Sequence, residues 1–250
     1  MYLDVQGLIV RATQYKDRDL LLTVLTSDLG RITVKVRNVR RRNSPLAVAC
    51  QLLAYSEFTL FEYKENYIAN DVRLVELFAG LRQDVNKLAL ATYFSQVASL
   101  ISQEDAPSPE LLPLLLNCLY GLASLGISEE KIKAVFELRC ACLAGFFPDL
   151  SGCRSCNCES PDYFDVSSGL LECFSCRSYG DNGIRMPISS GMLEAMRYIC
   201  FCDEKKIFSF SISEEAMLSL SQITETFLST QLERGFSALD IYKSLRIGVT

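Results

Sequence analysis

The chain has 250 residues, of which 49% are hydrophobic and 22% charged, a net charge of −5 and no histidine. This length and apolar content suit one large domain or two to three small ones, and they exclude a disordered chain. Without histidine the chain cannot build a Ser-His-Asp triad or a His-ligated catalytic zinc site, and it contains no glycine-rich phosphate loop. We therefore expect a protein that is not an enzyme.

The cysteines and the N-terminus indicate where the protein works. Eleven cysteines is an odd number, and those outside one cluster, such as Cys50 and Cys118, are scattered. Secreted domains instead carry a compact disulfide framework. Residues 1–13 contain Asp4 and Gln6 and lack the basic and apolar parts of a signal peptide. We expect a cytoplasmic protein, not an exported one.

The first eighty residues have the pattern of a strand-rich domain. Ile32, Val34 and Val36 alternate with polar residues, which predicts a strand with one buried face. The predicted strands cover 7–13, 19–26, 32–37, 52–63 and 67–78. Five short strands indicate a small closed barrel of the OB type, and an SH3-like barrel fits almost as well.

From Leu81 onward the hydrophobic period changes from two toward 3.6, which indicates helices. Gly126 suits the C′ position of a helix over 114–125, and Ser128 suits the N-cap of the next, which stops at Gly145. Two further helices are predicted over 189–199 and 213–232. These segments predict a helical bundle.

The uncharged stretch 111–128 is long enough to raise the question of a membrane span. Pro113, Asn117, Gly121 and Gly126 interrupt it. A buried helix is therefore favoured over a membrane segment.

Cys153, Cys156, Cys173 and Cys176 form two C-x-x-C pairs separated by sixteen residues. Four thiolates that fill a tetrahedron are typical of a closed structural zinc site, with one zinc per chain. The segment between the pairs predicts a short hairpin with almost no core, which zinc would stabilise. Other readings are four unligated thiols, a Cys153–Cys156 disulfide or a rubredoxin-like iron site. Cys158 is left out because one C-x-x-C turn on each side suits tetrahedral geometry.

The positive charge of the chain is concentrated near its N-terminus. Residues 1–80 hold 11 Lys and Arg against 9 Asp and Glu, whereas the rest hold 14 against 21. An acid-free run of six cations contains Arg31, Lys35, Arg37, Arg40, Arg41 and Arg42. Arginines on an OB barrel are typical of phosphate contacts along a nucleic-acid backbone, with Tyr15, Tyr63 and Tyr67 available to stack on bases. A solvated charge run is the alternative.

Together these patterns predict an α+β fold in four segments. They are an OB-fold nucleic-acid-binding domain over 1–80, a first helical part over 81–147, an inserted four-cysteine zinc module over 148–187 and a second helical part over 188–250.

Several motifs resemble the RecO family of bacterial recombination mediators. They are the opening residues 7–10, 15–23 and 30–34, the basic segment 37–44, and residues 136–139, 145–150 and 169–171 with the four cysteines. The likeness extends to about residue 180.

The resemblance implies a function in DNA repair and recombination. A protein of this family would bind single- and double-stranded DNA, anneal complementary strands and, with a RecR-like partner, help to load a RecA-type recombinase onto strands coated by single-strand-binding protein. It would work in the cytoplasm at the nucleoid, without a membrane. The alternative is a zinc-stabilised protein-interaction adaptor with little intrinsic DNA binding.

Overall fold

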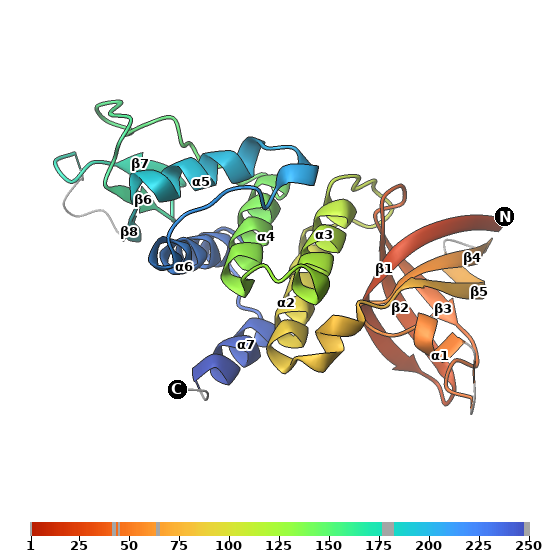
Figure 1. Cartoon of the computed structure of the whole chain (residues 1–250). Coiled ribbons are helices and arrows are strands. Elements are labelled where there is room, and N and C mark those ends of the chain that lie inside the picture. Colours follow the sequence, from red (N-terminus) through yellow and green to blue (C-terminus); the bar gives the residue numbers. More distant parts are fainter. Residues whose placement is uncertain (1, 42–43, 45, 64–65, 177–182, 248–250) are drawn as a thin grey trace. The chain divides into compact units, whose positions relative to one another are not determined.

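The computed structural model describes residues 2–41, 44, 46–63, 66–176 and 183–247 (Figure 1). The chain forms two compact units. The first contains Met1–Gly126 and Phe236–Thr250, and the second contains Ile127–Gly235. The four-segment division remains a prediction.

The first unit begins with a closed five-stranded barrel, drawn in red to orange in Figure 1. Its strands are β1 (Tyr2–Tyr15), β2 (Asp19–Thr26), β3 (Arg31–Val36), β4 (Tyr55–Tyr63) and β5 (Asn66–Glu76). The strand order is β1-β2-β3-β5-β4, with β4 closing onto β1 and only the β3–β5 pair parallel among the described strands. This order is that of an OB-type barrel and decides between the two predicted barrels.

The alternation in β3 builds the barrel core as predicted. Ile32, Val34 and Val36 are at most 2% exposed, whereas Thr33 between them faces solvent. They pack with Phe58 and other apolar side chains from the remaining strands. Each buried side chain of this size stabilises the fold by roughly 1.5–3 kcal/mol.

Two features of the barrel were not predicted. A short helix, α1 (Leu46–Ala49), lies between β3 and β4. Strand β4 begins at Tyr55, later than predicted, because Leu53 has a left-handed φ of 63° and its N–H donates to the Ile9 carbonyl at 2.8 Å. The apolar run before Tyr55 is therefore a buried turn.

The helices of the first unit are η1 (Ala79–Gln83), α2 (Val85–Ile101), α3 (Leu111–Ser124) and α7 (Ser237–Ile247). Gly126 follows α3 with a φ of 63°, as predicted for a C′ glycine. α7, which was not predicted, packs against α2, with the rings of Phe236 and Tyr93 5.3 Å apart. Among the described helices, none combines the length and apolar character needed to cross a membrane.

The second unit is built on α4 (Glu129–Leu143), α5 (Ser190–Phe201), η2 (Glu204–Lys206) and α6 (Glu214–Gln231). Ser128 caps α4 as predicted, since its hydroxyl accepts the N–H of Lys131. α4 and α6 pack together around the buried Lys133 of α4, whose ammonium lies 3.1 Å from the Glu137 carboxylate on the same helix and 2.9 Å from Glu225 on α6. Burial raises the pKa of Glu137, and Lys133 opposes that rise.

Candidate metal centre and nucleic-acid interface

A three-stranded sheet supports the cysteine segment in the second unit. Its strands are β6 (Tyr163–Asp165), β7 (Leu170–Glu172) and β8 (Arg185–Pro187), in the order β7-β6-β8. The predicted hairpin is β6–β7, and its turn is closed where the Asp165 carboxylate accepts the N–H of Ser167 at 3.0 Å. Gly169, with a φ of 72°, supplies the left-handed turn position. β8 was not predicted.

The four predicted cysteine ligands, Cys153, Cys156, Cys173 and Cys176, come together, with their sulfurs within 4.8 Å of one another. The sulfurs of Cys156 and Cys173 are 3.7 Å apart. A tetrahedral ion with bonds of about 2.3 Å has sulfur–sulfur edges of about 3.8 Å, so the four residues fit such an ion. Cys158 is outside this group, and its backbone carbonyl accepts the Cys153 N–H at 2.9 Å. The cluster could therefore hold a metal ion.

Backbone donors favour the thiolate at one corner of the cluster. Burial raises the pKa of Cys153, but N–H groups of Ser155, Cys156 and Cys173 outweigh burial and lower it to about 6. The Cys173 N–H lies 3.4 Å from the Cys153 sulfur. Burial raises the pKa of Cys173. Because the thiolate is the form that binds metal, these N–H groups favour the metal-binding form of Cys153.

A buried carboxylate joins both halves of the module. Glu172 immediately precedes the second cysteine pair and is fully buried. Its carboxylate lies 2.6 Å from Arg154, inside the first pair, and 2.6 Å from Arg185 on β8. Glu172 thus pairs with both arginines and connects the turn of the first cysteine pair with β7 and β8.

In the first unit, two of the predicted DNA-contacting cations have protein partners. The Arg31 guanidinium donates to the Ser99 carbonyl at 2.6 Å and pairs with Glu104 at 3.1 Å. Lys35 lies 3.6 Å from the Asp19 carboxylate. Phosphate contact by Arg31 and Lys35 remains a prediction, and Arg31 also joins the barrel to the segment around the end of α2.

The other predicted cations are more accessible for contact with a phosphate. Arg37, Arg40 and Arg41 are exposed, and none forms an ion pair with another described residue. Arg42 lies outside the described residues, as does the side chain of Tyr63.

The predicted stacking tyrosines differ from one another. Tyr15 is 41% exposed, with the Lys35 ammonium 4.8 Å from its ring centre. Tyr67 is half-buried and packs against the barrel core. Burial is the main cause that raises the pKa of Tyr67. Base stacking therefore suits Tyr15 better than Tyr67.

Two further cations were missed in the sequence. Lys16 and Arg18 are exposed in the turn between β1 and β2. This turn is hydrogen-bonded to the loop that follows β3, residues 37–41, here called the basic loop. The Arg40 N–H donates to the Arg18 carbonyl at 3.2 Å and the Asn38 N–H donates to the Asp19 carboxylate at 3.1 Å. We call these loops and the adjoining part of β3 the basic end of the barrel, with the cations Lys16, Arg18, Lys35, Arg37, Arg40 and Arg41. The β1–β2 loop of OB barrels is a usual nucleic-acid contact, which is the signal that could have indicated the first two.

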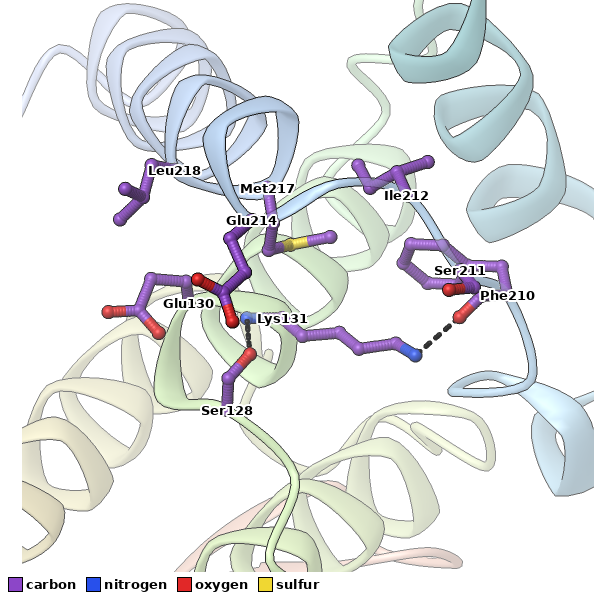
Figure 2. Close-up of a pocket in the computed structure, with 9 residues that line it drawn as sticks. All are labelled: Ser128, Glu130, Lys131, Phe210, Ser211, Ile212, Glu214, Met217 and Leu218. Atoms are coloured by element: carbon purple, nitrogen blue, oxygen red, sulfur yellow. Dashed lines mark hydrogen bonds between the residues drawn. The ribbon is translucent and has the colours of Figure 1, made fainter.

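A pocket of about 390 Å³ lies in the second unit, where α4 and α6 begin (Figure 2). Phe210, Ile212, Met217 and Leu218 supply apolar lining. Figure 2 shows Lys131 reaching across to the 210–212 segment, where its ammonium donates to the Phe210 carbonyl. The pocket contains none of the predicted site residues.

The fold and sites define an OB-barrel protein with a second, helical unit that carries a candidate metal centre. Family models match almost the whole chain, as "Recombination protein O N terminal" over residues 1–78 and "Recombination protein O C terminal" over residues 82–240.

Curated relatives match over nearly their full length. The chain is 30% identical to the DNA repair protein RecO of Acetivibrio thermocellus, over 98% of this chain and 97% of that protein. It is 28% identical to the DNA repair protein RecO of Caldicellulosiruptor saccharolyticus, over 98% and 99%, and 29% identical to that of a Dehalococcoides mccartyi strain, over 97% and 95%. The chain therefore belongs to the RecO family of DNA repair proteins.

Proposed function

We propose that this RecO-family chain is a DNA-binding recombination mediator that works without covalent chemistry. The observation that carries the proposal is the basic end of the barrel, where the loops before β2 and after β3 lie side by side and bring five exposed cations together. The planar guanidinium group of arginine suits bidentate hydrogen bonds to phosphate. Phosphate-led binding has little sequence preference and falls steeply with salt.

Charge neutralisation gives a physical route to strand annealing. Two single strands repel each other through their phosphates, and cations that neutralise them lower this repulsion. The exposed ring of Tyr15, 41% accessible, can stack on an unpaired base. The proposed substrates are single- and double-stranded DNA at the nucleoid. The proposed partners are a RecR-like protein, single-strand-binding protein and, indirectly, a RecA-type recombinase.

The four cysteines are proposed to hold one structural zinc ion. The 3.7 Å gap between Cys156 and Cys173 and the four-sulfur donor set support zinc. With all four positions of the ion filled by protein, no position is left for a substrate. We also propose that the segment over 148–187 is the part whose folding depends on this ion.

The test is a fluorescence-anisotropy titration of a labelled oligonucleotide across a series of salt concentrations. Replacing Arg37, Arg40 and Arg41 with Ala should weaken single-strand binding and flatten the log–log salt slope by about two units, since each phosphate contact contributes about 0.7. The matched control replaces Lys205, Lys206 and Arg234, which are exposed in the second unit, and removes the same charge. Equal slopes for both triple variants would remove the barrel from the binding site.

A protein-interaction adaptor is the second candidate, and the pocket in Figure 2 favours it. Its lining combines the apolar side chains of Phe210, Met217 and Leu218 with the carboxylates of Glu130 and Glu214, an apolar site with a few polar groups that could orient a side chain of a partner. The adaptor predicts little DNA affinity at physiological salt and no difference between the triple variants. The same titration therefore separates the two candidates.

A further inference from the structure

A second pair of thiols lies in the second unit, where α4 and α5 end. Cys142 is in the last turn of α4 and Cys200 in the last turn of α5. Their sulfurs are 3.8 Å apart. A disulfide bond is about 2.0 Å long, so the two sulfurs must move closer together to bond. Small rotations of the two side chains suffice for this movement. Cys142 is partly exposed and Cys200 is 4% exposed.

This pair has too few donors for a second metal centre. Within the described residues, the Cys153 cluster is the only group of three or more side chains placed to hold an ion. Cys202, the next thiol along the chain, is directed toward the Ile199 carbonyl at 4.0 Å. Two close thiols without a third donor favour sulfur–sulfur chemistry over metal binding.

An arginine gives the pair an electropositive setting. Arg139 lies one turn before Cys142 on α4 and donates to the carbonyls of Cys200 at 3.1 Å and Cys202 at 2.6 Å. The contact with the Cys200 thiol lowers the pKa of Cys142, burial opposes this, and the charge of Arg139 lowers it further. The contact with Cys142 raises the pKa of Cys200. Cys142 is also the more exposed of the two thiols, so peroxide reaches it first, and Cys200 is placed to resolve it.

We propose that Cys142 and Cys200 form a reversible disulfide when the protein meets hydrogen peroxide. The Cys142 thiolate attacks one peroxide oxygen, the O–O bond breaks, and the products are a Cys142 sulfenic acid and hydroxide, which takes up a proton. The sulfur of Cys200 then attacks that of Cys142, and the sulfenic oxygen leaves as water. In total two thiols lose two electrons and two protons, and one peroxide becomes two waters. A thiol reductant reverses the bond.

The position of the pair gives the bond a structural consequence. Cys142 and Cys200 are 58 residues apart, and the whole cysteine module lies between them in the chain. A disulfide here would tie the two ends of that segment together while the metal ligands stay outside the bond. A cross-link that closes a long loop lowers the conformational entropy of the unfolded chain most. Oxidation should therefore stabilise the folded unit, in which α4 and α5 are held together.

The test is a thiol map of the full-length protein as purified, with its metal content measured. The protein is treated with limiting peroxide, the remaining thiols are alkylated, and peptides are analysed by mass spectrometry without reductant. A Cys142–Cys200 linked peptide, about 2 Da lighter than the two thiol peptides, should form before the Cys153 cluster loses alkylation. A Cys142–Cys202 link, or earlier oxidation of the Cys153 cluster, would overturn the proposal. This readout does not depend on DNA binding.

Two variants sharpen the assignment of roles. Cys200→Ala should abolish the link and leave a Cys142 sulfenic acid that a dimedone probe traps. The matched control, Cys202→Ala, should form the link at an unchanged rate. If Cys200→Ala fails to fold, as circular dichroism would show, the map of the unaltered protein still decides. Equal dimedone labelling of Cys142 in Cys200→Ala and in the unaltered protein would show that Cys200 does not resolve it.

Discussion

The cysteine module and the basic end of the barrel differ in how their chemistry is assembled. In the module, all four predicted ligands meet within 4.8 Å. Among the cations predicted to contact DNA, Arg31 pairs with Glu104 and Lys35 lies beside Asp19, whereas Arg37, Arg40 and Arg41 remain exposed. A metal site requires its members to converge, but a charge run can be divided between structural and surface roles.

The difference follows from the distances along the chain. A C-x-x-C turn brings two sulfurs together locally, so two such turns need only one hairpin to meet. The partner of Arg31 is 73 residues away, and the turn that carries Arg18 meets the basic loop through the pairing of β2 with β3 and a backbone hydrogen bond between the two loops. Spacing in the sequence thus specifies the metal site better than the surface patch.

The largest effect should come from metal removal. Chelation removes a binding free energy on the order of 10 kcal/mol, which in such a small module is folding free energy. We expect about one zinc per chain by elemental analysis. On chelation the helical unit should lose stability, as measured by circular dichroism. Cys173→Ser should lower soluble yield more than DNA affinity per folded molecule. Cys158→Ser is the matched control and should keep its zinc. A larger loss of affinity than of yield would place DNA at the module.

The next effect tests the buried charge that supports the module. Glu172→Gln removes the counter-charge of Arg154 and Arg185, and breaking a buried ion pair costs about 3 kcal/mol. Chemical denaturation should show this loss, whereas Glu159→Gln, an exposed acid of the same module, should change stability by less than about 0.5 kcal/mol. Equal stability of the two variants would mean that Glu172 is not needed to hold the cysteine pairs.

Arg31 tests the division of roles at the barrel. Arg31→Met removes a charged hydrogen bond to the Ser99 carbonyl and the pair with Glu104, and should cost about 1 kcal/mol of stability. The salt slope of DNA binding should stay unchanged, because these contacts already engage the side chain. A flattened slope with unchanged stability would instead support the predicted contact of Arg31 with DNA.

The sequence predicted the elements that local patterns define. The alternation of Ile32, Val34 and Val36 and the caps at Ser128 and Gly126 are local signals, and all are present in the structure. The helix α7 was missed. Its apolar side chains pack against α2, more than a hundred residues earlier, and this contact cannot be read from its own sequence.

The candidate sites follow the same division. The four cysteines were predictable because their spacing describes the tetrahedron. Lys16 and Arg18 were not, because their place beside the basic loop depends on bonds between backbones, such as Arg40 N–H to the Arg18 carbonyl. The partners of Arg31 and Lys35 were missed for the same reason.

The smallest effect should come from a single cation of the β1–β2 turn. Arg18→Gln removes one exposed charge and no described ion pair, so folding stability should stay within about 0.5 kcal/mol. If the turn and the basic loop bind the same DNA strand, the log–log salt slope should fall by about 0.7, which is the contribution of one phosphate contact on a single strand. Arg234→Gln, exposed in the second unit, is the matched control and should leave the slope unchanged. An unchanged slope for Arg18→Gln, together with a flattened slope for the triple variant, would limit the DNA contact to the loop after β3.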